Sequence, residues 1–160
     1  MSSFQGKVVV ITGGAGEIGK ATAKLLVSDG ADVLLVDCSQ KALDAAVAEI
    51  GSKRVSACLA DVTDVASTQA YIRAAVDRFG GIDVLLSNVG IEGKVAPIFD
   101  ADPADFDRVI AVNVRGVWLS LKYAIPEIRK RGGGSIVSHR RLPGCAVSQG
   151  SRLTSPASMR

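Results

Sequence analysis

The chain has 160 residues, is 48% hydrophobic and carries a formal net charge of +3, which suits one globular domain and excludes an intrinsically disordered protein. Its apolar runs are far too short to cross a bilayer, and its first residues lack the charged and apolar regions of a signal peptide. The three cysteines are odd in number and have no metal-ligand spacing, so we expect buried thiols in a cytoplasmic protein, with no metal and no membrane partner.

Apolar strands alternate with amphipathic helices over most of the chain. The continuous β-branched run at 8–12 predicts a buried strand, and a glycine-rich turn separates it from a helix at 17–28. Further strands are predicted at 32–36, 55–59, 84–87 and 135–137, and further helices at 40–50, 63–79 and 103–131, the last with a kink at Pro126. This alternation predicts an α/β fold, a doubly wound parallel sheet of the Rossmann type.

The pattern stops after Val137. Residues 138–160 show no helical or strand period, and they contain four arginines and no acidic residue. We therefore divide the chain into a dinucleotide-binding domain at 1–137 and an aberrant tail at 138–160 that we expect to be disordered. Because the basic tail lacks charge clusters and aromatic side chains, we expect no nucleic-acid partner. The fifth strand would lie at an unpaired edge, which leaves the sheet incomplete at its C-terminal side.

The turn after the first strand has the spacing of a phosphate-binding loop. Gly14, Gly16 and Gly19 fit G-x-G-x-x-G, and the loop opens a helix. Glycines allow the backbone to approach a pyrophosphate, and the N–H groups at a helix N-terminus bind its charge. A glycine-rich turn can also be only a turn, but its position between a strand and a helix favours dinucleotide binding.

Asp37 ends the second strand, 18 residues after Gly19. A carboxylate at this place accepts hydrogen bonds from the ribose hydroxyls and repels a 2′-phosphate, so it favours NAD over NADP. The other reading is an ordinary aspartate in a turn at the end of a strand.

Several motifs occur in the order found in the short-chain dehydrogenase/reductase family, which the chain resembles from about Gly6 to Val137. They are Thr12-Gly13 with Ile18-Gly19, Asp61-Val62, Asn88-Val89-Gly90, Asn113 and Gly134-Ser135-Ile136-Val137. The resemblance implies that Asp61 and Val62 hold the adenine ring and that the stretch from Asn88 to Gly90 lies beside the cofactor. It also implies an oxidoreductase acting on a small-molecule secondary alcohol or ketone, and intact relatives that are homo-oligomers.

The resemblance gives a complete set of expected site residues. The expected NAD-binding residues are Gly13, Gly14, Gly16, Ile18, Gly19, Asp37, Asp61, Val62, Asn88, Val89 and Gly90. Asn113 is the one expected member of the catalytic set, where it keeps a helix distorted and anchors a water of the proton relay. Taken singly, Asp61 also fits a helix cap, Asn88 a turn and Asn113 a polar position inside a helix.

The chain departs from the family at two positions in the matching region. Glu17 stands where the family has Gly or Ala, and its charge either weakens pyrophosphate binding or sits without harm at the positive end of the helix. Ser87 replaces a more usual Asn, which is a milder change.

The family's catalytic Ser, Tyr and Lys are not found where the resemblance places them. The Ser position holds Arg141 and the Tyr position falls near Thr154, while no Tyr follows Tyr123 and no Lys follows Lys130. Residues 153–160 can be written in codons that, read in a shifted frame, encode Tyr-Leu-Ala-Ser-Lys. We therefore expect a frameshift near codon 138, with truncation, that leaves the chain inactive. The alternatives are a non-catalytic NAD-binding module and an enzyme that uses His139 as an atypical acid/base.

Overall fold

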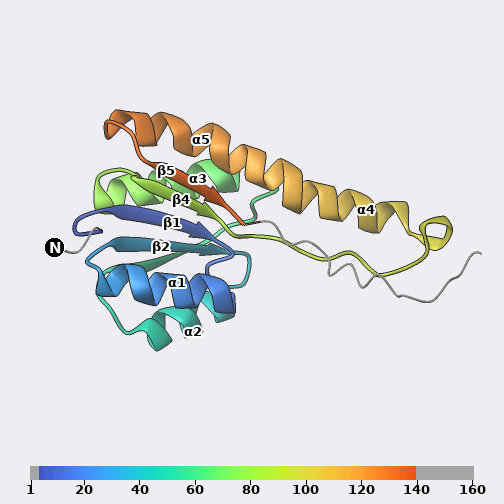
Figure 1. Cartoon of the computed structure of the whole chain (residues 1–160), viewed down its shortest axis with the longest axis horizontal. Coiled ribbons are helices and arrows are strands. Elements are labelled where there is room, and N and C mark those ends of the chain that lie inside the picture. The colour runs from blue at the N-terminus through green and yellow to red at the C-terminus, as the bar shows by residue number, and fades with distance from the viewer. Residues whose placement is uncertain (1–3, 140–160) are drawn as a thin grey trace, which may run out of the picture.

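The computed structural model describes residues 4–139, which form a single five-stranded parallel sheet with helices on both faces (Figure 1). The strands lie in the order β3-β2-β1-β4-β5, so the predicted doubly wound fold is confirmed. The strands are β1 (Val8–Thr12), β2 (Asp32–Asp37), β3 (Val55–Leu59), β4 (Val84–Ser87) and β5 (Ser135–Ser138). The helices are α1 (Glu17–Ser28), α2 (Gln40–Ile50), α3 (Val65–Phe79), η1 (Ile98–Asp100), α4 (Pro103–Ile110), η2 (Ala111–Gly116) and α5 (Val117–Lys130).

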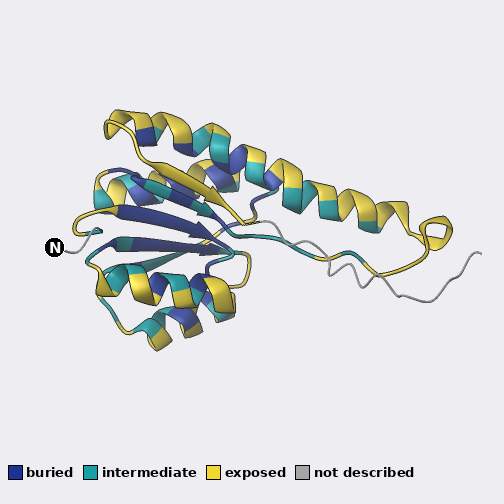
Figure 2. Ribbon diagram, in the orientation of Figure 1, coloured by how far each residue is buried: buried dark blue, intermediate teal, exposed yellow. Residues whose placement is uncertain are grey.

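Two hydrophobic clusters sandwich the sheet. Successive strand residues point to opposite faces, so Val9 and Ile11 of β1 pack under α1 and α2, while Val10 packs under α3 and α5. The central strand β1 is buried at every residue, as a continuous β-branched run predicts (Figure 2). The helices on the two faces of the sheet therefore cover β1 completely.

The helix ends follow from local chemistry. Asp64 caps α3 by accepting a hydrogen bond from the Ser67 N–H at 2.7 Å, and Gly80 ends the helix in the left-handed conformation with a φ of 84°. The helix predicted at 63–79 therefore begins two residues later than expected. The strands β2 and β5 each include one residue more than predicted, Asp37 and Ser138.

The helix predicted at 103–131 differs most from expectation. It consists of α4, the π-helix η2 and α5, and the helical course continues through Pro126 to Lys130. Two tertiary contacts hold the wider, π-helical turn of η2. Asn113 bonds to the backbone of Ile91, and Gly116 packs so closely on Val62 that a Cβ would lie 2.8 Å from the valine Cγ2. The expected loop before Asp102 contains the short helix η1.

The strand β5 pairs with β4 and has no second neighbour among residues 4–139. All four of its residues are exposed, and the predicted edge position is confirmed for the described part of the chain. Within that part, none of the helices has both the length and the apolar character needed to cross a membrane. Of the tail predicted at 138–160, Ser138 belongs to β5, which corrects that boundary, and His139 is also described. Residues 140–160 lie outside the described residues.

Candidate nucleotide-binding site

The loop between β1 and α1 needs glycine for two geometric reasons. Gly13 has a φ of 63°, and a Cβ there would lie 3.0 Å from the Cα of Val89. A Cβ on Gly19 would lie 2.7 Å from the carbonyl oxygen of Gly13. The first turn of α1 therefore packs directly on the loop, and the helix N-terminus opens toward the carboxyl ends of the strands.

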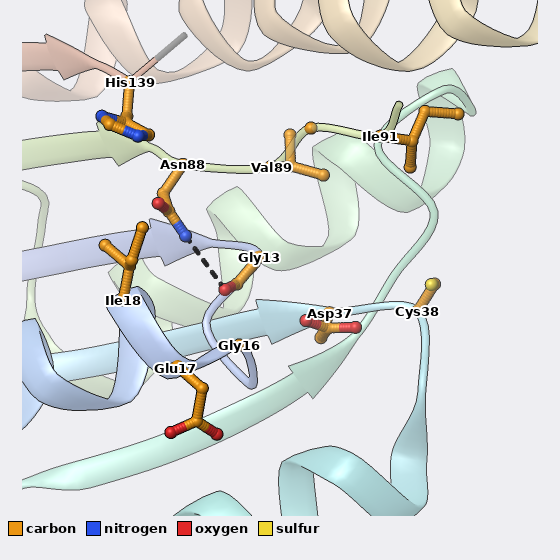
Figure 3. A pocket seen from close by; sticks show the side chains of 11 residues that line it. Gly13, Gly16, Glu17, Ile18, Asp37, Cys38, Asn88, Val89, Ile91 and His139 are labelled. Carbon is orange, nitrogen blue, oxygen red and sulfur yellow. Dashed lines mark hydrogen bonds between the residues drawn. The ribbon is translucent and has the colours of Figure 1, made fainter. Parts of the chain in front are cut away.

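Hydrogen bonds tie this loop to both neighbouring strands. On the β2 side, the Ala15 N–H donates to Oδ2 of Asp37 at 3.3 Å. On the β4 side, Nδ2 of Asn88 donates to the Gly13 carbonyl at 3.1 Å (Figure 3). The Val89 N–H also donates to Oγ1 of Thr12, at 3.4 Å. Asp37 and Asn88 thus hold the same loop from opposite sides.

A cavity of about 330 Å³ lies over this loop, at the carboxyl ends of the strands. It is the place where open α/β sheets bind ligands. The cavity is lined by Gly13, Gly16, Glu17, Ile18, Asp37, Cys38, Asn88, Val89, Gly90, Ile91 and His139. Seven of the predicted cofactor residues are in this set, so the structure brings most of the predicted site together.

A second, smaller cavity of about 110 Å³ adjoins the first and shares five lining residues with it, namely Gly13, Asp37, Cys38, Val89 and Ile91. Its lining is mostly apolar and includes Asp61 and Val62. Oδ1 of Asp61 also accepts bonds from the N–H and the hydroxyl of Thr63, both at 2.8 Å. Asp61 therefore orders the turn before α3, whereas the helix cap itself is Asp64.

Three predicted residues lie outside both linings. Gly14 and Gly19 pack beneath the loop, where Gly14 touches Leu35 and Gly19 touches the loop backbone. Asn113 lies in η2, and its amide makes two bonds of 2.9 Å to Ile91, accepting from the N–H and donating to the carbonyl. Because Ile91 borders both cavities, Asn113 acts on the site through the backbone of that residue.

Sequence reasoning missed several lining residues. Ile91 and Val112 directly neighbour the predicted residues Gly90 and Asn113, so their place in the chain was the available signal. Cys38 follows Asp37 at the rim of both cavities, where the residue is exposed overall, and Cys58 is only half-buried, so the expectation of buried thiols is wrong for these two cysteines. Burial, and then the nearby charge of Asp37, raise the pKa of the Cys38 thiol, which keeps it in the unreactive protonated form.

The described residues offer few acid/base groups at the cavity. Tyr71 is fully buried in α3, donates its hydroxyl proton to Ser120 at 2.8 Å, and lines neither cavity. Burial raises the pKa of Tyr71 to about 12. The imidazole of His139 does border the larger cavity, while its backbone N–H donates to the Ser87 carbonyl at 2.9 Å. Arg141 and Thr154, the positions expected for the family's Ser and Tyr, lie outside the described residues.

Comparison with known proteins identifies the family. A family model described as short chain dehydrogenase matches residues 7–140. The chain belongs to this family. The match ends close to the position where the motifs of the sequence end, so the resemblance predicted from those motifs is confirmed in kind and in extent.

Relatives of this short-chain dehydrogenase include several oxidoreductases. Levodione reductase of Leifsonia aquatica is 39% identical over 145 residues, which are 88% of this chain and 54% of the relative. Momilactone A synthase of Oryza sativa subsp. japonica is 40% identical over 140 residues, 86% of this chain and 50% of the relative. The chain thus spans about half the length of the curated relatives it matches.

Solved structures agree with these relatives. The crystal structure of levodione reductase is similar with a TM-score of 0.81 at 40% identity, over 84% of this chain and 54% of the other. A xylitol dehydrogenase structure with bound NAD⁺ has a TM-score of 0.80 at 35% identity, over 85% and 53%. A 3-ketoacyl-(acyl-carrier-protein) reductase from Brucella melitensis, in complex with NADH, has a TM-score of 0.81 at 34% identity, over 85% and 57%.

Proposed function

We propose that this chain binds NAD in the two adjoining cavities. The observation that carries the proposal is the place of Asp37, whose carboxylate ends β2, borders both cavities and already bonds to the glycine loop. A carboxylate there suits the two free hydroxyls of an NAD ribose and repels the phosphate of NADP. The nicotinamide ligands named for two of the similar structures support the same cofactor class.

The residues present fit a dinucleotide along its whole length. The apolar slot with Asp61 and Val62 would take the adenine, and Asp37 would take the ribose. The loop from Gly13 to Ile18 would take the pyrophosphate at the N-terminus of α1. Asn88, Val89 and Gly90 would border the nicotinamide half. When bound, the cofactor supplies the hydride acceptor or donor, and the residues named here bind and orient it.

By family, the activity is NAD-dependent oxidation or reduction at a secondary alcohol or ketone of a small molecule. We propose that the 160-residue chain does not catalyse it. The sequence has no Tyr after Tyr123 and no Lys after Lys130, so the acid/base pair that the resemblance implies is missing. Without a positioned group to move the proton, hydride transfer loses about 10²–10⁴-fold in rate. We further propose that a frameshift near codon 138 removed the pair.

Titration of the full chain tests this proposal. NADH fluorescence and calorimetry should show saturable binding of NADH, weaker binding of NADPH, and no NAD⁺ reduction with secondary alcohols. Binding of NADPH as tight as that of NADH would contradict the assignment of Asp37. Absence of binding to either nucleotide would contradict the NAD site itself.

A non-catalytic NAD-binding module is the second candidate function, and it is favoured because the described residues that line the cavity include no Tyr and Lys pair. It predicts NAD binding without turnover together with a specific protein partner whose affinity changes with NAD occupancy. We also propose homo-oligomers for intact relatives, since the exposed apolar side chains of α4 and α5 are typical of a subunit contact. We propose a cytoplasmic location as well, since Cys38 and Cys58 are free thiols.

A further inference from the structure

Glu17 is the first residue of α1 and borders the larger cavity, where its family has a small residue. The N-terminus of a helix attracts anions, and the proposed pyrophosphate would lie at this one. A carboxylate that belongs to the protein competes with such a ligand and repels it. The chain therefore needs a means of keeping the Glu17 charge apart from the phosphates.

Lys20, one turn further along α1, supplies this means. Its ammonium lies 2.7 Å from Oε1 of Glu17 and 2.8 Å from Oε2 of Glu49 in α2. Only 16% of the Lys20 side chain is exposed, against 91% for Glu17, so the lysine is the fixed partner of the pair. In Figure 3 the Glu17 side chain points away from Gly13 and Asn88, outside the space between the loop and β4.

Glu49 anchors Lys20 from the neighbouring helix. Its Oε1 also accepts a bond of 2.7 Å from Lys24, so one carboxylate joins two lysines of α1. Hydrogen bonds from Lys20 and Lys24 lower the pKa of Glu49 to about 2, and bonds to Glu17 and Glu49 raise the pKa of Lys20. Lys20 and Glu49 therefore stay charged at neutral pH and stabilise each other.

We propose that Lys20, held in place by its ion pair with Glu49, is a positioning residue. It keeps the Glu17 carboxylate out of the phosphate subsite and thereby strengthens dinucleotide binding. This inference rests on the proposed NAD site. The interaction of two unit charges about 4 Å apart in water is strong enough to change a binding affinity about fivefold. A Glu17 carboxylate that is free to approach the pyrophosphate should therefore weaken NADH binding measurably.

A double-mutant cycle measures this effect, with NADH as the probe and dissociation constants taken from fluorescence. Lys20→Met should weaken NADH binding about fivefold in the natural chain, and at most about twofold in a Glu17→Gln background. Glu17→Gln alone should bind NADH as tightly as the natural chain or more tightly. Lys20→Arg should restore binding, because it keeps a cation between Glu17 and Glu49.

Lys24→Met is the matched control. It removes a lysine of the same helix that also pairs with Glu49 but forms no ion pair with Glu17, so it should change NADH affinity at most twofold. Glu49→Gln loosens Lys20 without changing either residue of the proposed pair. It should weaken NADH binding, by less than the loss of about fivefold expected for Lys20→Met, and again only while Glu17 is present. It replaces Lys20→Met in the test if that variant does not fold.

Each outcome decides between the two proposals. Equal losses from Lys20→Met in both backgrounds would show a merely structural role and overturn the positioning role, as would no loss in either. Natural protein that folds but does not bind NADH would overturn the proposed function, and this inference with it. A loss confined to the Glu17 background, absent in Lys24→Met, supports the inference.

Discussion

The backbone N–H of Ala15 donates a hydrogen bond to Oδ2 of Asp37 at 3.3 Å, and this joins the glycine loop to the end of β2. The bond fixes the Asp37 carboxylate at the border of both cavities before any ligand binds. Only one of its oxygens is engaged in this contact, so the group keeps acceptor capacity for a ribose hydroxyl. The Asp37 side chain therefore holds the glycine loop and is also the group that we propose selects NAD over NADP.

The first prediction concerns this carboxylate. Asp37→Ala should weaken NADH binding by about 1.5–3 kcal/mol, the range for a hydrogen bond to a charged group, and should reduce the preference for NADH over NADPH. Calorimetry with both nucleotides measures the two effects together. Asp44→Ala in α2, an exposed change outside both cavities, is the control. An unchanged preference in Asp37→Ala would contradict the selectivity role.

Asp83 leads to a prediction on acid stability. This buried carboxylate precedes β4 and accepts bonds from the Val8 N–H at 2.9 Å, from Arg131 at 2.9 Å and from Lys7 at 3.4 Å. Burial opposes its charge, but these bonds and the two cations outweigh burial and lower the pKa of Asp83 below its ordinary value. The group thus joins β1, β4 and the end of α5.

A carboxyl with a lowered pKa in the folded state contributes stability at pH values above its unfolded pKa, and the contribution is lost as the pH falls through the lower, folded value. Asp83→Asn should therefore cost about 1–3 kcal/mol at pH 7, and the cost should shrink below about pH 4. Urea unfolding at pH 7 and pH 3 measures the difference. Lys130→Ala breaks an exposed pair with Glu127 and should change stability by at most about 0.5 kcal/mol. A constant cost at both pH values would exclude the electrostatic explanation.

Ser87 carries a buried hydroxyl without a hydrogen-bond partner among the described residues. An unsatisfied buried polar group is unfavourable, so its removal should not destabilise the fold. Ser87→Ala should raise the free energy of unfolding or leave it within about 0.5 kcal/mol. A loss of more than 1 kcal/mol in denaturant titration, beyond what we expect for this change, would mean that the hydroxyl has a partner in solution. Thr12→Ala is a useful contrast, because that hydroxyl accepts a bond from Val89.

Most of the fold could be predicted because each element carries its own local signal. The buried run of β1 and the glycine that ends α2 both act within a few residues, and those bounds agree with the structure. The π-helix η2 has no local signal, and only the family resemblance implied a distorted helix at Asn113, because the distortion depends on the contact of Asn113 with Ile91, 22 residues away in the chain. Apolar periodicity alone does not distinguish such a turn from an α-helical one.

The predicted residues that border the cavities stand where the backbone conformation or the end of a strand restricts the residue type. The missed lining residues stand where only the packing of the fold brings a side chain to a cavity. Gly13 and Asp37 have few substitutes in their roles, and both border the cavities. Val112 and Cys38 are ordinary side chains that reach the cavities only through the packing of η2 and of the turn after β2. The salt bridge between Lys20 and Glu49 joins two helices and has no signature in either one.

The fourth prediction concerns the gene. Sequencing around codon 138 should show a small insertion or deletion, and the shifted frame should encode a Tyr-x-x-x-Lys pair. Restoring that frame should give NAD⁺ reduction with secondary alcohols, at least about 10²-fold above the present chain. His139→Gln in the present chain is the matched test of an atypical acid/base, since His139 borders the cavity. A shifted frame without the pair would contradict the frameshift, and turnover that depends on His139 would contradict inactivity.

The last prediction is that the expressed chain self-associates. The strand β5 lies at the sheet edge with Ile136 and Val137 exposed, and unpaired edges of this kind add strands from other molecules. The segment from the loop before η1 to the first turn of α5 carries a group of exposed apolar side chains, namely Val95, Ile98, Phe99, Phe106, Val114 and Trp118. Figure 2 shows exposed residues along α4 and the loop before it, which extend beyond the sheet. Apolar surface of this kind is typical of subunit contacts and of aggregation.

Light scattering over a range of protein concentrations measures this association. The natural chain should show a mass that rises with concentration, and Phe106→Ser combined with Trp118→Ser should lower it, because both changes remove exposed apolar surface from that helical segment. Leu25→Ser is the matched control, since Leu25 is also exposed but lies on α1, across the sheet. A monodisperse monomer with cooperative melting would contradict the prediction. An equal effect of Leu25→Ser would assign the association to general hydrophobicity rather than to the surface of α4 and α5.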